Sequence, residues 1–138
     1  MDNKLVGLLV VFFLIFGLFT SLLIFRQPIT RLTRAKEDYT PSSAKTLIFA
    51  WPLTLTADGK KEAKINVFVR NERGMPIVNK KVSLNTNLGT VKEIQSVSDQ
   101  QGKTEFNITS EQEGTAKVKA IIAGNIEITQ TVSVQFTK

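Results

Sequence analysis

Hydrophobic and polar positions divide the chain into two unlike parts. From Leu5 to Phe25 no residue is charged, and the only polar side chains are Thr20 and Ser21, near the far end of the run. An α-helix rises about 1.5 Å per residue, so this run covers roughly 31 Å, close to the thickness of a bilayer's hydrocarbon core. The pattern predicts one transmembrane helix over residues 5–25, preceded by a short tail of residues 1–4.

A cleaved secretory signal is the alternative interpretation, because Lys4 precedes the run as a basic residue precedes the apolar core of a signal. Such a core is usually about 7 to 15 residues long and ends in small residues. Here the run is longer and leaves through bulky side chains at 22–25. A lipoprotein anchor needs a cysteine to carry the lipid, and the chain has none. We therefore expect a retained membrane anchor.

Residues 26–46 have no apolar periodicity and predict a juxtamembrane stalk. The segment contains Pro28, Pro41 and the charged string 34–38. Part of it, around 30–37, is able to extend the membrane helix, with Pro28 kinking or breaking that extension. Its basic side chains are expected near lipid head groups, and they are Arg26, Arg31, Arg34 and Lys36.

From Leu47 onward the period of apolar residues changes to two, as in half-buried strands. The alternating apolar positions are Ile65, Val67, Val69, Val82, Leu84, Phe106, Ile108, Ala116, Val118, Ala120, Ile122, Ile126, Ile128, Val132, Val134 and Phe136. Gln130 interrupts the last run on its apolar side, which suggests a bulge or a change of sheet in a long final strand.

Turn signals fall between these strands, and no helical period appears after the stalk. Gly, Asn or Asp occurs at 58–59, 71–76, 87–89, 99–102, 113–114 and 124–125. Short strands at this spacing, with no helices to cross over, predict an all-β fold. We expect a single immunoglobulin-like antiparallel β-sandwich over 47–138, preceded by one transmembrane helix and held together by packing alone.

Composition removes most catalytic chemistry. The chain has no Cys and no His, so it lacks thiolate nucleophiles, the commonest general base and the commonest metal ligands. No Gly-rich phosphate loop and no paired carboxylates appear. The net charge of +6 is spread over alternating acidic and basic residues. We expect no enzyme activity, no cofactor, no metal, no small-molecule substrate and no nucleic-acid partner.

An ordered set of short motifs covers nearly the whole stretch 53–136. The motifs are Ala57-Asp58-Gly59, Arg73-Gly74-Met75-Pro76-Ile77, Val82-Ser83-Leu84, Leu88-Gly89-Thr90, Ser98-Asp99-Gln100-Gln101-Gly102-Lys103-Thr104 and Gly114-Thr115-Ala116-Lys117-Val118-Lys119-Ala120. In this order and spacing they resemble the group 1 bacterial immunoglobulin-like domain, the repeat of invasin and intimin adhesins.

The resemblance implies structural roles for these motifs and an extracytoplasmic location for the domain. The implied turn residues are Asp58, Gly59, Gly74, Pro76, Gly89, Asp99, Gly102 and Gly114. Members of the family usually occur as tandem arrays with a barrel anchor or a recognition domain at the tip, whereas this chain has one copy behind one helix. Receptor binding of the invasin kind is therefore not carried over.

The two lines of reasoning disagree about orientation. Lys4 and the α-amine precede the span, and four basic residues follow it within 26–36. The positive-inside rule alone would place the β-domain in the cytoplasm. The resemblance favours the opposite side, and an apolar segment behind a short tail commonly acts as a signal anchor. We expect a single-pass protein of the bacterial cell membrane with the β-domain extracytoplasmic.

Two functions remain open. The first is a structural, adhesive or protein-interaction module at the cell envelope, bound to the bilayer and to an envelope or surface protein, including another copy of itself. The second is a subunit of a surface filament or secretion assembly with apolar helices in its core, where Gly17 and Ser21 permit close helix contact. Trp51, near Phe49, is expected to close one end of the sandwich core, with contact to lipid or a partner as the alternative.

Overall fold

The computed structural model describes the backbone of residues 2–138 and the side chains of residues 2–22 and 39–138. The chain forms two compact units, Met1–Lys36 and Glu37–Lys138. The first unit is helical, and the second contains all the described strands.

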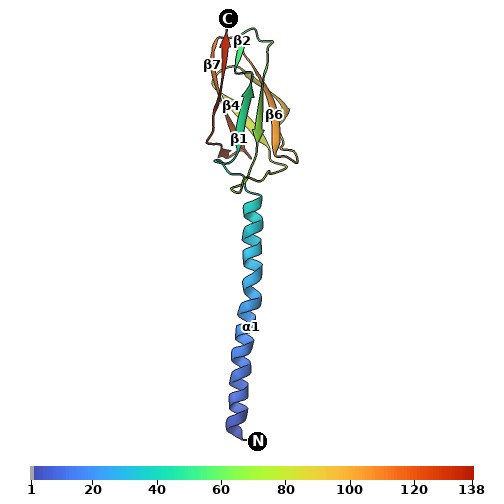
Figure 1. Ribbon diagram of the computed structural model, residues 1–138, viewed down its shortest axis with the longest axis vertical. Helices are drawn as coiled ribbons and strands as arrows, with labels where there is room; N and C mark the ends of the chain where they lie inside the picture. The colour runs from blue at the N-terminus through green and yellow to red at the C-terminus, as the bar shows by residue number, and fades with distance from the viewer. Residues whose placement is uncertain (1) are drawn as a thin grey trace. The chain divides into compact units, whose positions relative to one another are not determined.

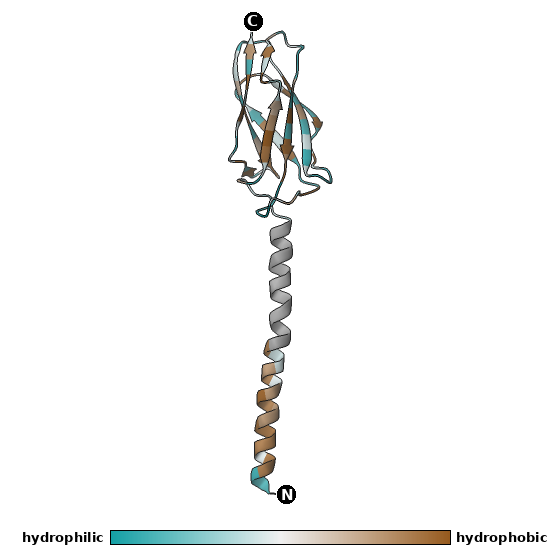
Figure 2. Cartoon of the chain, viewed as in Figure 1, coloured by the Kyte–Doolittle hydropathy of each residue, from teal (hydrophilic) through white to brown (hydrophobic). Residues whose placement is uncertain are grey.

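Helix α1 (Asn3–Asp38) begins where the backbone N–H groups of Leu5 and Val6 bond to the carbonyl of Asp2. Its stretch Asn3–Leu22 is long and apolar enough to cross a membrane. Figure 2 colours most of this stretch as hydrophobic, and its large apolar side chains from Leu5 to Leu22 are exposed. The Thr20 hydroxyl donates to the Phe16 carbonyl, so this polar group has its hydrogen-bond partner within the helix.

The expected connection, 26–46, is helical as far as Asp38, and α1 is not interrupted at Pro28. The helical backbone thus continues well past the end of the uncharged run at Phe25. The basic side chains expected near head groups, those of 26–36, lie outside the described side chains.

The second unit is a β-sandwich, which confirms the predicted fold class (Figure 1). Its strands are β1 (Leu47–Trp51), β2 (Thr54–Thr56), β3 (Ala63–Phe68), β4 (Val82–Thr86), β5 (Thr90–Gln95), β6 (Lys103–Thr109), β7 (Gly114–Ile122), β8 (Ile126–Glu127) and β9 (Val132–Thr137). One sheet has the order β1-β3-β6-β5. The other has the order β2-β9-β7-β4, with β8 also paired to β7. All these pairs are antiparallel except β2 with β9, which is the immunoglobulin-like arrangement.

The core lies between the two sheets and follows the predicted alternation. Strand β7 buries every second residue from Ala116 to Ile122, and β6 buries Phe106 and Ile108. The largest fully buried side chains are Phe106, Phe136, Ile48, Ile65, Ile77, Ile108, Ile122, Val67, Val69, Val82, Val118 and Val134. Burying each such side chain contributes about 1.5–3 kcal/mol, so packing can stabilise this domain without a disulfide.

The chain changes sheet between β1 and β2, at the cis peptide bond Trp51–Pro52. Immediately after the crossing, the Leu53 carbonyl accepts a bond from the N–H of Gln135 in β9. Strand β1 therefore lies at the edge of one sheet and β2 at the edge of the other.

Of the two irregularities expected at Gln130, a bulge or a change of sheet, the change of sheet is wrong. Strands β8 and β9 both pair with β7, so the chain stays in one sheet and is interrupted there. The interruption has a local cause, because the N–H of Thr129 bonds to the Ser43 carbonyl and the Gln130 side chain turns toward β1. These bonds draw residues 129–130 away from β7.

Candidate interaction surface

Three aromatic side chains gather on the outer face of the β1-β3-β6-β5 sheet. Ile48 faces the core, so strand alternation turns Phe49 and Trp51 outward from β1. Val67 and Val69 are buried on either side of Phe68, which turns Phe68 outward from β3. The rings of Phe49 and Phe68 pack edge to face with centroids 6.0 Å apart. We name Phe49, Trp51 and Phe68 the aromatic strip.

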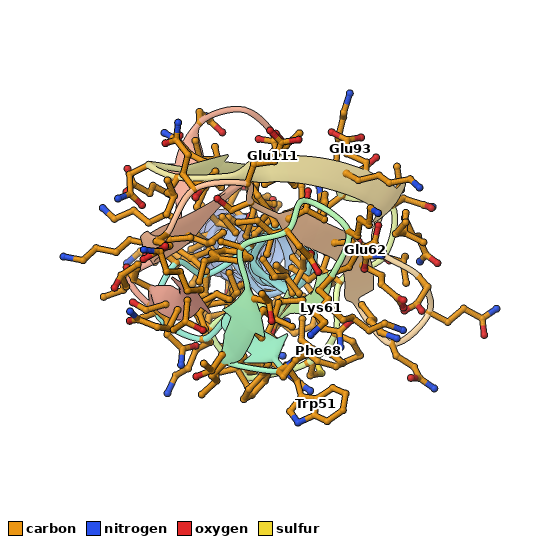
Figure 3. All side chains as sticks on the ribbon, turned by 90° about the horizontal axis from the view of Figure 1, so that it is seen from above. Trp51, Lys61, Glu62, Phe68, Glu93 and Glu111 are labelled. Atoms are coloured by element: carbon orange, nitrogen blue, oxygen red, sulfur yellow. The ribbon has the colours of Figure 1, made fainter. Side chains whose placement is uncertain are left out.

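The strip is open to solvent. Trp51 is 77% exposed and Phe49 is 50% exposed. Seen from above, the Trp51 ring stands clear of the domain at one margin, with Phe68 on the same side, and Glu93 and Glu111 lie at the opposite margin (Figure 3). Leu53, after the sheet crossing, is 54% exposed. Phe68 is half-buried, and the two exposed aromatic side chains make the strip a candidate interaction surface.

The expectation that Trp51 closes the sandwich core is wrong. Trp51 lies three residues after the buried Ile48 on the same strand, so its side chain belongs to the outer face. Lys64 of β3 is its neighbour across the strand pair, and Lys64 is also exposed. The other interpretation of the sequence, contact with a partner or with lipid, remains.

Charged residues of both signs lie beside the aromatic strip on the same face. Glu105 of β6 accepts bonds from Lys64 at 2.8 Å and from Lys103 at 3.0 Å. The Lys64 bond is the main cause that holds the pKa of the Glu105 carboxyl below its ordinary value of 4.5, and the Lys103 bond is the second. These pairs are partly exposed, so they add little to stability. They fix positive and negative groups side by side at the border of the strip.

The strand edges of the domain are closed or short. The Ile48 N–H, on the β1 edge, donates to Oε1 of Gln130 at 3.1 Å. Strand β2 has three residues, and β5 carries a register shift between Glu93 and Gln95. The start of β4 is covered, because the N–H of Val82 bonds to the Ser96 carbonyl. Short, bulged and capped edges discourage pairing with a foreign strand, so the outer face is the better candidate for contact.

The outer face of the second sheet is polar. A shallow groove of about 590 Å³ is lined there by Asn85, Thr86, Asn87, Lys117, Lys119, Thr131 and Ser133. Lys119 is paired with Glu127 at 2.6 Å, and the Asn87 side chain bonds to the backbone of β7. Among the described residues, no group of three His, Cys, Asp or Glu side chains is arranged to hold a metal ion.

A model of the bacterial Ig-like domain (group 1) matches residues 52–137, more than half of the chain. The chain belongs to this family. Similar solved structures include invasin, a bacterial integrin-binding protein, at 26% identity and a TM-score of 0.65 over 71% of this chain. The Yersinia pseudotuberculosis adhesin InvE matches at 17% identity and a TM-score of 0.64 over 71%. The D00-D0 domain of intimin matches at 23% identity and a TM-score of 0.54 over 67%.

The bacterial Ig-like domain accounts for only part of these longer proteins. The chain covers 20% of the invasin structure, 28% of InvE and 46% of the intimin fragment. No curated protein matches the chain. The similarity therefore establishes the family and the sandwich fold.

Val82-Ser83-Leu84 lies in β4 and the motif that begins at Gly114 lies in β7, whereas the Asp and Gly residues of the other family motifs lie at turns. Oδ1 of Asp58 accepts the N–H groups of Lys60 and Lys61, and Oδ1 of Asp99 accepts those of Gln101 and Lys103. The glycines of these motifs with positive φ are Gly59, Gly74, Gly89, Gly102 and Gly114.

Hydrogen bonds from backbone N–H groups hold the pKa of both turn carboxyls below the ordinary value of 3.8. For Asp58 the bond from Lys61 is the largest cause, and for Asp99 it is the bond from Lys103. At Gly102 an added Cβ would lie 2.5 Å from the Val69 carbonyl oxygen. Pro76 pairs with Arg70 in the crossing that connects β3 to β4. Asp58, Asp99 and the positive-φ glycines of the motifs lie in or beside turns, apart from the aromatic strip.

Two features of the surface were missed by sequence reasoning. The pairing of Phe49 with Phe68 depends on the β1–β3 register, which the sequence does not give. The segment 47–51 nevertheless carried a signal, since both of its faces are apolar. A strand that is apolar on both faces and lies at a sheet edge leaves one apolar face without cover. Nothing in the sequence indicated that the Gln130 side chain would bond to the Ile48 N–H on the β1 edge.

Proposed function

We propose that this protein is a single-pass, membrane-anchored Ig-like module of the bacterial cell envelope that makes protein contacts through its aromatic strip. The observation that carries the proposal is the exposure of Trp51 beside Phe49 on an otherwise well-packed sandwich. Aromatic residues of this kind dominate binding energy in protein interfaces. Family membership supports the proposal, because invasin is an integrin-binding protein and intimin binds the translocated intimin receptor.

The anchor in this proposal is helix α1, with the lipid bilayer as its partner. A helix that is apolar on all sides is suited to a membrane or to the interior of a helical assembly. A cleaved signal predicts a mature protein that lacks the apolar run 5–25 and is released by an alkaline wash of the membranes. A retained anchor predicts full-length protein that leaves the membrane only with detergent. Mass measurement of the N-terminus and membrane extraction decide between them.

The proposed orientation puts the β-domain outside the cytoplasm. Family membership supports this, and the basic residues of 26–36 oppose it through the positive-inside rule. Protease added to spheroplasts should digest the β-domain while a cytoplasmic marker stays intact. Protection of the β-domain in spheroplasts, with digestion after lysis, would refute the proposed orientation.

The contact role is tested in native membranes with a photo-crosslinking residue. Placing it at Phe49 should yield adducts with protein partners, and placing it at Ser133, on the outer face of the other sheet, should yield few. A Trp51→Ala substitution should reduce the Phe49 adducts while the Ser133 background stays unchanged. Equal adduct yields from the two faces would contradict a contact role for the strip.

A second candidate function is a subunit of a surface filament or secretion assembly, with the apolar helices packed in its core. The observation that favours it is the apolar circumference of α1 together with Gly17 and Ser21, a small-xxx-small pair. An added Cβ at Gly17 meets nothing within 4 Å, so this position is open to a neighbouring helix. Shearing of cells should then release the protein in high-mass particles. Recovery only in the membrane fraction would exclude this candidate.

A further inference from the structure

We propose that the outer face of the second sheet binds an acidic polysaccharide, held in the groove over β4, β7 and β9. This surface belongs to the sheet that does not carry the aromatic strip, so the inference goes beyond the proposed protein contact and does not depend on it. Three observations carry it: the charges of this face, its unused hydrogen-bonding groups, and the side chains that line the groove.

The charged side chains of the groove are basic. Strands β4, β7 and β9 contain no Asp or Glu. Ala116 and Val118 face the core, so strand alternation turns Lys117 and Lys119 of β7 outward, where both line the groove. Lys119 is paired with Glu127 of β8, whereas the Lys117 ammonium has no carboxylate partner in the described part of the chain. The groove therefore attracts a negatively charged ligand.

The groove also holds polar groups that the domain does not use. Asn85 of β4 lies opposite Lys119, and Ser133 of β9 lies opposite Lys117. The side chains of Asn85, Thr131 and Ser133 make no hydrogen bond with other described residues. Hydroxyl and amide groups both donate and accept hydrogen bonds, and the hydroxyls of a sugar do the same. These side chains therefore suit a ligand with many hydroxyl groups.

The shape and lining of the groove favour a polymer of sugars over other anionic partners. The groove is shallow, has a volume of about 590 Å³ and has no aromatic or large aliphatic side chain in its lining. A folded protein would find no pocket for an anchor residue, and nucleic-acid bases would find no ring on which to stack. The stems of the two lysines and the threonine methyl groups offer small apolar surfaces that fit the C–H groups of a sugar ring.

Binding to one domain should be weak and sensitive to salt. An exposed ammonium group contributes at most about 1 kcal/mol to a single ion pair, and salt screens that attraction. A polysaccharide repeats its carboxylate along the chain, so several domains held in one membrane can bind one polymer together. Weak single sites are then sufficient for firm attachment.

The test uses the full chain in micelles of a non-ionic detergent and an end-labelled oligogalacturonate, with binding followed by fluorescence anisotropy. A dextran oligomer of equal length supplies sugar without charge, and polyglutamate supplies carboxylates without sugar. We expect the oligogalacturonate to bind more tightly than either, and to bind less tightly as salt is raised. Equal binding of dextran or of polyglutamate would overturn the inference.

Two substitutions of opposite sign locate the site. Lys117→Gln should lower the affinity by up to about fivefold, while Lys92→Gln, an equal charge change on exposed β5 of the other sheet, should leave it unchanged. Glu127→Gln frees the Lys119 ammonium and should raise the affinity, with Glu93→Gln as its control on β5.

Circular dichroism checks that all four variants are folded. If each variant binds as tightly as its control, the effect is one of net charge alone and the groove is not the site. The photo-crosslinker at Phe49 reports on the other sheet, so this result leaves the proposed protein contact to its own test.

Discussion

Replacing Trp51 by Ala should leave the stability of the domain nearly unchanged. The side chain is 77% exposed, and only the remaining quarter of its surface is in contact with the domain. Surface substitutions of this kind change the free energy of unfolding by no more than about 0.5 kcal/mol. Phe106 is 0% exposed in the middle of the core, and Phe106→Ala is the matched control. The free energy of unfolding of Phe106→Ala should be lower by about 3–5 kcal/mol.

The assay is urea unfolding of the full chain in detergent micelles, followed by circular dichroism of the β-structure. The helix in the micelle contributes a nearly constant background, so the transition reports the sandwich. Trp51 is the one tryptophan of the chain, and its native fluorescence should already be close to that of a solvated indole. A loss above about 2 kcal/mol in Trp51→Ala would refute the reasoning, because that magnitude belongs to a buried side chain.

Three further substitutions test the turns and the strand edge. Gly102→Ala should destabilise the domain by more than about 2 kcal/mol in the same assay, because its φ is +75° and the new Cβ would lie 2.5 Å from the Val69 carbonyl oxygen. Asp99 has a lowered folded pKa, so its contribution is present above the ordinary pKa of 3.8 and is lost as the pH falls through the lower folded value. In Asp99→Asn the loss of stability at acidic pH should therefore be smaller, as measured by thermal unfolding at several pH values. If the variant and the natural protein lose the same stability below about pH 4, the reasoning is contradicted. Gln130→Ala should cost about 1 kcal/mol, because the Ile48 N–H loses its acceptor, and a matched Gln112→Ala in an exposed turn should cost less.

The core of the sandwich could be predicted from the sequence because each core strand has one buried face. Ile65 and Val67 alternate with Lys64 and Asn66, so the two-residue period predicts which face of the strand is buried. Segment 47–51 has apolar residues on both faces, and the period alone does not choose between Ile48 and Phe49. The choice comes from pairing with β3 and from the crossing at Pro52. This is why Trp51, a residue type that is usually buried, was expected inside.

The closure of the strand edges could not be predicted, because it depends on bonds between distant parts of the chain. The acceptor on Gln130 lies 82 residues from the Ile48 N–H that it binds. The acceptor on Asn87 lies 30 residues from the Lys117 N–H. The Gln130 bond joins β1 to a segment of the other sheet, so it requires the finished sandwich, whereas the Asn87 bond follows from the pairing of β4 with β7. From the sequence, Gln130 was visible only as a polar residue at an apolar position.

The side chains of Gln130 and Asn87 both bond to backbone groups that no neighbouring strand pairs. These bonds affect how other chains can bind to the domain. A side-chain amide carries one acceptor and one donor group, as a backbone peptide does. Beyond the end of β4, Asn87 donates to the Thr115 carbonyl and accepts the Lys117 N–H, so it takes the place of the missing strand beside β7. Gln130 does the same for one N–H of β1. A membrane anchor crowds copies together, and open strand edges would then pair without a fixed end. The two amides thus occupy backbone groups of β1 and β7 that an added strand would need, and the aromatic strip is the exposed apolar surface on which the proposed contact role rests.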